Sequence, residues 1–202
     1  MISSLRQILF IASAVALMTA CSVLPEQVPV DLYQLPAPVV ERAADGPSLA
    51  ALRIARPLSS EALGGNRLLI MSSDNQLQAL AGMRLAGPLP LLWRDWLLDG
   101  FGRDGRVPGL SASSAGLEAE LELSGMLRAF YVDATGSQPE AVIHFDASLI
   151  STTQRRVIAN RRFAARQPMS TVTAPDAVSA LGAAANKLLP ELIQWTLMQG
   201  QD

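Results

Sequence analysis

The chain has 202 residues, of which 16 are basic and 18 are acidic, and its formal net charge is −2. Charge this close to balance argues against nucleic-acid binding, which needs a strongly basic surface. Half of the residues are hydrophobic but only 5% are aromatic, and this length and composition suit one domain with an apolar core.

Residues 1–20 have the pattern of a bacterial signal peptide. Arg6 precedes an apolar run from Ile8 to Met18, which is shorter than the about 20 residues needed to cross a bilayer. The run leads into Thr19, Ala20 and Cys21, and this junction resembles the lipobox of bacterial lipoproteins, with Met18 where Leu is usual. We therefore predict cleavage after Ala20 and lipid modification of Cys21.

Two alternatives for this segment are an ordinary secretory signal beside an incidental cysteine, and a buried hydrophobic helix. Cys21 is the only cysteine, so it cannot form an internal disulfide, and a free thiol would be a liability in an oxidising compartment. A diacylglycerol and an N-acyl chain on Cys21 explain its presence and would anchor the protein firmly to a membrane. Ser22, in place of Asp, resembles the sorting signal for the outer membrane, and we expect the protein on its periplasmic face.

Residues 21–48 are predicted to form an extended tether after the lipidated N-terminus. Prolines recur along this stretch and prevent a helix or a central strand; they are Pro25, Pro29, Pro36, Pro38 and Pro47. Only residues 33–35 are apolar enough to dock as an edge strand. A single domain is predicted over residues 49–202.

The first half of this domain is predicted to contain short strands and one helix. Strands are expected at 52–55, around 67–71 and over 77–85, where apolar and polar residues alternate. From Pro90 the apolar residues change to helical spacing, which predicts a helix from about Pro90 to Phe101, ended by glycines.

The second half is predicted to be an antiparallel meander followed by a helix. Its strands cover 117–131, with a bulge at Gly125, then 141–149 and 157–166. Asp176 is placed to cap the last helix, and Pro190 is expected to kink it. The apolar stripe of this helix comprises Val178, Leu181, Ala185, Leu188, Leu192 and Trp195. The pattern predicts an α+β fold, with one mainly antiparallel sheet of about five or six strands packed against two α-helices.

Side chains that could carry out catalysis are scarce. His144 is the only histidine and shares the polar face of a predicted strand with Asp146, which favours a surface or edge histidine. The serines after Gly109 lack the second glycine of a nucleophile elbow, and Lys187 is the only lysine, outside any phosphate-binding loop. We therefore predict that the protein is not an enzyme, and that it has no metal or cofactor apart from the lipid on Cys21.

Charged and aromatic residues give the remaining candidate contacts. Five arginines crowd the last predicted hairpin: Arg155, Arg156, Arg161, Arg162 and Arg166. One interpretation is a solvated hairpin that pairs with Glu118, Glu120 and Glu122 on a neighbouring strand; the other is contact with phosphate headgroups or an acidic partner. Trp93 and Trp96 are interpreted as core or groove-lining residues, with contact to a partner as the alternative.

The order of these motifs resembles the ABC-type transport auxiliary lipoproteins, the PqiC-like family. After the lipobox come Tyr33 and Leu35, a strand that opens the domain, and residues 75–79 running into Pro88 and a helix. Residues 159–163 and a closing Ala-rich helix with Trp195 complete the pattern over nearly the whole mature chain. Many relatives carry a Trp near the position of Leu85 in this chain, so a partner contact made by that Trp would be either absent here or made by Trp93.

The resemblance implies a non-catalytic subunit of an MCE-type (mammalian cell entry) lipid transport system. The chain would sit in the outer membrane and dock a periplasm-spanning MCE-domain protein, and it could form a homo-oligomer. Two rival functions are an assembly or activation factor for a cell-wall synthase or outer-membrane machine, and a lipoprotein that binds a small molecule. Fold alone does not separate them.

Overall fold

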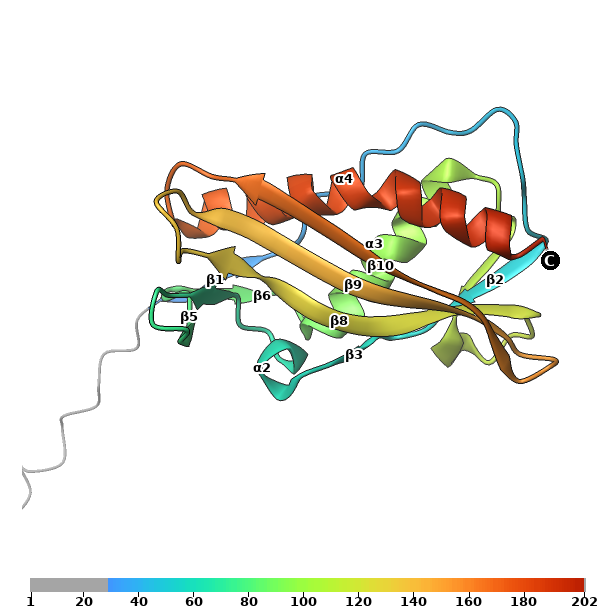
Figure 1. Cartoon of the computed structure of the whole chain (residues 1–202), viewed down its shortest axis with the longest axis horizontal. Helices are drawn as coiled ribbons and strands as arrows, with labels where there is room; N and C mark the ends of the chain where they lie inside the picture. Colours follow the sequence, from blue (N-terminus) through green and yellow to red (C-terminus); the bar gives the residue numbers. More distant parts are fainter. Residues whose placement is uncertain (1–28, 202) are drawn as a thin grey trace, which may run out of the picture.

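A meander of three long antiparallel strands forms the centre of the protein: β8 (Leu121–Asp133), β9 (Glu140–Ser151) and β10 (Arg156–Pro168) (Figure 1). The computed structural model describes residues 29–201, so Cys21 and the signal peptide lie outside the described residues. Alternating apolar and polar residues give each strand one buried face. The meander predicted from this alternation is confirmed.

The irregularity in β8 lies beyond the position predicted from Gly125. The pairing of β8 with β9 shifts between Leu127 and Ala129, not at Gly125. Gly125 serves a different purpose, because a Cβ there would lie 2.3 Å from the backbone oxygen of Asp146. Glycine is therefore required for the close approach of β8 to β9.

Short strands extend the sheet along the other edge of β8. Three of them pair with β8 in parallel, one after another: β2 (Ala51–Ile54), β3 (Leu58–Ser59) and β4 (Leu69–Met71). β7 (Gly109–Ala112) pairs with β2, and β5 (Leu77–Ala79) with β4. The α+β class is confirmed, and the sheet has eight strands, more than expected, because strands this short carry little periodicity.

The single strand predicted over residues 77–85 is wrong. Gly82 has a φ of 71° and turns the chain between β5 and β6 (Met83–Leu85). β6 leaves the main sheet and pairs in parallel with β1 (Asp31–Tyr33), the strand expected near Tyr33. The alternation continues across the turn, and so it does not reveal that the two halves have different partners.

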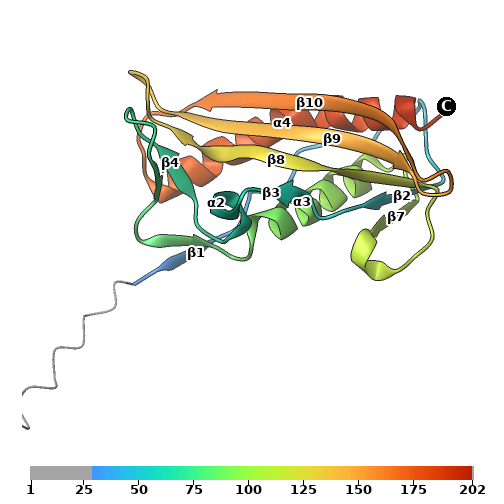
Figure 2. The same ribbon diagram turned by 60° about the horizontal axis from the view of Figure 1, so that its bottom comes forward.

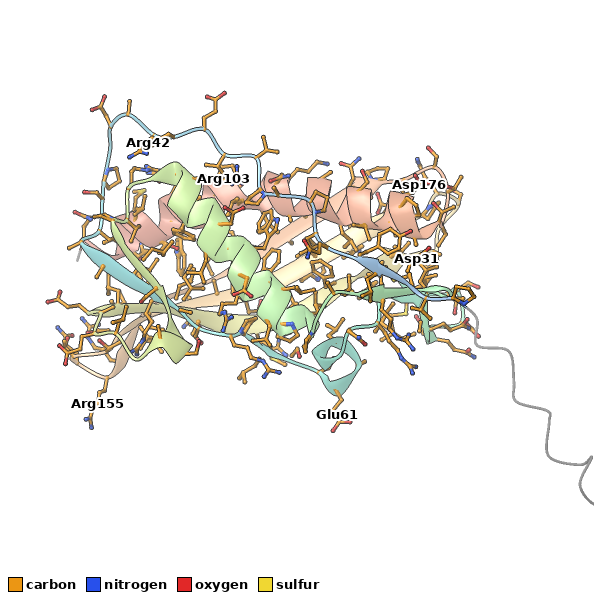
Figure 3. The ribbon with its side chains drawn as sticks, turned by 180° about the vertical axis from the view of Figure 1, so that it is seen from behind. Asp31, Arg42, Glu61, Arg103, Arg155 and Asp176 are labelled. Carbon is orange, nitrogen blue, oxygen red and sulfur yellow. The ribbon has the colours of Figure 1, made fainter. Side chains whose placement is uncertain are left out.

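Two long helices, α3 (Leu89–Asp104) and α4 (Ala174–Gln199), cover one face of the sheet. In Figure 1 the sheet lies in front of α3, and from behind, in Figure 3, α3 lies in front of the sheet. A third helix, α2 (Glu61–Gly64), is one turn long. Thr173 caps α4 by accepting from the Asp176 backbone N–H, and its hydroxyl donates to the Asp176 carboxylate. The predicted capping role of Asp176 is confirmed, and the whole predicted apolar stripe of α4 is buried.

Residues 31–48, which we call the strap, are extended but lie against the folded unit. After β1 the strap crosses the helices, and its contacts continue to β2 (Figure 1). Trp96 Nε1 donates to Pro36 O at 2.8 Å, and Val39 N donates to Asn186 Oδ1 at 2.8 Å. The domain therefore includes much of the segment predicted as a tether.

Gly182 on α4 makes room for the strap. A Cβ at this position would lie 2.7 Å from Pro36 Cγ, so a larger side chain must displace the strap. We expect Gly182→Leu to speed tryptic cleavage after the exposed Arg42 by roughly tenfold or more, because local opening exposes the backbone. N-terminal sequencing of the fragments measures the rate.

Ala183→Leu is the matched control, because Ala183 is the next residue of α4 and is exposed. Cleavage after Arg42 should keep the wild-type rate in that variant. Equal rates in Gly182→Leu and Ala183→Leu would show that Gly182 does not hold the strap in place.

Candidate docking surface

The two faces of the meander differ in chemistry because side chains alternate along each strand. On β9 the residues that face the helices are buried: Ala141, Ile143, Phe145, Ala147 and Leu149. His144, Asp146 and Ser148 point to the opposite face and are partly exposed. We call this opposite side of β8–β10 the polar face; in Figure 2, α3 and α4 lie on the other side of the sheet.

Asp146 is the centre of the charge network on the polar face. Arg162 Nε on β10 lies 2.6 Å from Asp146 Oδ1, and Arg128 Nε on β8 lies 2.9 Å from Oδ2. Hydrogen bonds from Arg162 and then Arg128 lower the pKa of Asp146 to about 2. The carboxylate stays charged at any physiological pH and fixes the two guanidinium groups across three strands.

Arg166 forms a second bridge at one end of the same face. Its Nη1 lies 3.0 Å from Glu140 Oε2 and 3.2 Å from Asp133 Oδ2. Partial burial, and then Arg166 and Arg162, lower the pKa of His144, so its imidazole is neutral at neutral pH. His144 is partly exposed, which agrees with the interpretation as a surface histidine, but β9 lies between β8 and β10 and is not an edge strand.

The predicted pairing of the hairpin arginines with Glu118, Glu120 and Glu122 is wrong. The hairpin arginines that form ion pairs bind other carboxylates. β9 separates β10 from β8, and register brings Arg162 opposite Asp146. Arg161 pairs with Glu191 of α4 at 3.0 Å. Glu122 instead binds Arg53 and Ser113, at 2.8 and 2.7 Å.

The four arginines predicted to contact a partner do not share one face. Arg155 has a φ of 53° in the β9–β10 turn, and Arg156, the first residue of β10, donates from Nε to Gln154 Oε1 at 2.5 Å. Neither of these two arginines forms an ion pair with another described residue. Strand alternation places Arg162 on the polar face and Arg161 on the helix side, where its guanidinium lies 4.9 Å from the centroid of the Phe163 ring. All four are exposed.

Trp93 and Trp96 belong to the core, which agrees with one of the two interpretations and removes them from partner contact. Trp93 is 0% exposed and stacks on Trp96 at 5.4 Å. Its ring also meets Phe130 and Phe145 edge-on, at 6.0 and 5.9 Å. Trp96 lines a groove between the strap and α3, but it is only 5% exposed.

Metal-binding side chains do not converge within the described residues. No cluster of three His, Cys, Asp or Glu side chains in residues 29–201 could hold a metal ion. No described helix is long and apolar enough to span a bilayer. The network around Asp146 fixes charges on an exposed surface and suits recognition.

Comparison with known proteins decides the family. The model of the family described as "ABC-type transport auxiliary lipoprotein component" matches residues 33–192. The chain belongs to this family. The auxiliary lipoprotein family thus covers the unit from β1 into α4, and the resemblance inferred from the sequence is confirmed. A search of curated proteins finds no match.

Solved structures support the fold of this auxiliary lipoprotein. The crystal structure of XCC0632 from Xanthomonas campestris, a DUF330 protein, matches with a TM-score of 0.76 and 24% identity, covering 85% of this chain and 97% of that one. A second crystal structure, of an uncharacterized protein, matches with a TM-score of 0.64 and 18% identity, covering 83% and 98%. At these identities the likeness shows the fold alone.

Sequence reasoning missed the central role of Asp146 and the part played by Arg128 and Glu191. His144 and Asp146 are two residues apart on a strand, and this spacing correctly indicated that both lie on its polar face. Arg128, in contrast, reaches this face beside the irregularity in β8, and its position could not be read from simple alternation.

The charge network predicts a pH-dependent contribution of Asp146 to stability. Its folded pKa of about 2 lies below the unfolded value of about 3.9, so the contribution is present above pH 4 and is lost as pH falls towards 2. We expect Asp146→Asn to lower the free energy of unfolding at pH 7 by about 1 kcal/mol, since solvent screens this partly exposed site. Urea unfolding at pH 7 and pH 2 measures the loss.

Asp45→Asn, at an exposed position of the strap, is the control and should change little at either pH. The difference between wild type and Asp146→Asn should disappear near pH 2. A loss of equal size at both pH values would contradict the assigned electrostatic role of Asp146.

Proposed function

We propose that this auxiliary lipoprotein is a non-catalytic docking subunit of an MCE-type ABC system that moves lipids between the inner and outer membranes. Cys21 would anchor it to the periplasmic face of the outer membrane. The observation that carries the proposal is the family match, which spans residues 33–192 and describes an auxiliary transport component. The partner is an MCE-domain protein that reaches across the periplasm.

The surface chemistry supports binding. Arg128, Arg162 and Arg166 are fixed by carboxylates on the polar face, so their guanidinium groups are already ordered when a partner arrives. Ordering before contact reduces the entropy lost on association. Remaining N–H donors of these guanidinium groups can still reach acidic side chains.

Because the strap is bound to the domain, the distance between the domain and the membrane is limited. Because residues from Asp31 onwards are bound to the domain, only about ten residues separate the predicted anchor from the first strand. At about 3.3 Å per residue they span at most about 30 Å. Asp31 and Arg155 lie at opposite ends of the molecule (Figure 3), so the β9–β10 turn can point away from the anchor.

Affinity purification of the full-length lipoprotein from detergent-solubilised membranes tests the partner. We expect mass spectrometry to recover an MCE-domain protein with its permease and ATPase. Recovery of a peptidoglycan synthase in their place would support the assembly-factor alternative and contradict the proposal. A matched purification of an unrelated outer-membrane lipoprotein gives the background.

The anchor gives a separate prediction. Cys21→Ser removes the thiol that accepts the diacylglycerol, so we expect loss of palmitate labelling and loss of the protein from the outer-membrane fraction. Ser22→Asp should keep the label but move the protein to the inner membrane. Labelling that persists in Cys21→Ser would show that another residue is modified.

A further inference from the structure

β10 forms one border of the main sheet. The strand order is β10-β9-β8-β2-β7, and among residues 29–201 β10 pairs with β9 alone. Its other edge therefore presents backbone N–H and C=O groups that can pair with another chain. At 13 residues β10 is long for an edge strand, and such length invites pairing.

Hydrogen bonds at the end of β10 show which of its residues direct their backbone N–H and C=O groups away from β9. Met169 N donates to Pro139 O at 2.9 Å, towards β9. Arg166 O instead accepts from Lys187 Nζ on α4 at 3.0 Å. Backbone groups alternate along an antiparallel strand, and the register is unbroken from Ala159 to Pro168. The backbone N–H and C=O groups of Asn160, Arg162 and Ala164 therefore point away from β9, as those of Arg166 do.

A groove lies between this edge and the C-terminal half of α4. We call it the α4 groove; its volume is about 610 Å³, and its lining includes Arg161, Glu191, Trp195 and Met198. Met198 is 55% exposed, and Val157 near the start of β10 is 48% exposed. A strand added beside β10 would direct alternate side chains over this groove, where apolar groups fit.

The charge of the edge points to an acidic occupant. Residues 155–168 contain five arginines and no Asp or Glu. The side chains of Arg162 and Arg166 are 64% and 50% exposed despite their ion pairs. On an added strand, side chains opposite the apolar ones would lie beside these two arginines, where carboxylates would be favoured.

We propose that the outer edge of β10, from Asn160 to Ala164, binds an extended segment of a partner protein by strand addition. The segment alternates acidic and apolar side chains: the acidic ones lie beside the arginines and the apolar ones in the α4 groove. This inference rests on the proposed docking function, because it specifies the chemistry of the partner segment. The competing explanation is that the arginines only protect the edge from aggregation.

A peptide of alternating Glu and Val, labelled with a fluorophore, is the direct probe. We expect it to bind the full-length lipoprotein in detergent, and fluorescence anisotropy measures the affinity. A Lys and Val peptide should bind at least about tenfold more weakly, because its charge is reversed. The Glu and Val peptide with an N-methyl group at every residue should also lose about tenfold, since it cannot donate backbone hydrogen bonds from either edge.

Ala164→Pro tests the same edge from the protein side. It removes an outward N–H that β9 does not use, and Pro is tolerated at such edge positions. Ala164→Val, which keeps the N–H, is the control. We expect about tenfold weaker peptide binding in Ala164→Pro than in Ala164→Val; if Ala164→Pro does not fold, the N-methylated peptide still tests the edge.

Failure to bind the Glu and Val peptide would overturn the inference, as would equal binding of the N-methylated peptide. If the MCE-domain protein co-purifies with both Ala164 variants equally, the docking function stands and this edge is not its site. If no MCE-domain protein co-purifies with wild type while the peptide results hold, the edge binds acidic strands and the proposed function fails.

Discussion

The helix-facing side of β8, β9 and β10 is buried beneath α3 and α4, and its central contacts are aromatic. Trp93 from α3 meets Phe130 and Phe145 of the sheet, and Trp195 from α4 meets Phe163 at 5.5 Å. Burial of each large apolar side chain contributes roughly 1.5–3 kcal/mol, so this layer is costly to rearrange. With one face committed to the helices, every second residue of the meander must face away from them.

That constraint determines where the charges lie. Arg161 and Arg162 are neighbours in sequence but pair with different elements, α4 and β9. The polar face carries the fixed network around Asp146. On the side beside α4, the Arg161 guanidinium lies over the Phe163 ring. A surface of ordered guanidinium groups suits binding, which fits an auxiliary component of a transporter.

The sequence predicted those parts of the fold in which periodicity is long. Strands β8 to β10 and helix α4 each repeat their pattern over ten or more residues, and all four were predicted. The two- to four-residue strands depend on tertiary partners, so the turn at Gly82 and the parallel pairing of β3 were missed. Docking of the strap after residue 35 was also missed, because prolines predict an extended chain but not what that chain touches.

The arginines show the same limit at the candidate site. Composition identified the basic hairpin, and Arg155, Arg156, Arg161 and Arg162 are indeed exposed. Their carboxylate partners depend on register and on α4, which a single sequence does not specify. Glu191, 30 residues from Arg161 in the chain, could be identified as its partner only once α4 was placed beside β10.

Photo-crosslinking in living cells tests the central claim, that this protein docks an MCE-domain partner through the β9–β10 region. A photoreactive residue would replace Arg156 at the start of β10 or, as a control, exposed Glu41 on the strap. We expect an adduct with the MCE-domain protein from position 156 and none from position 41. An adduct from position 41 alone, or adducts only with cell-wall enzymes, would contradict this claim.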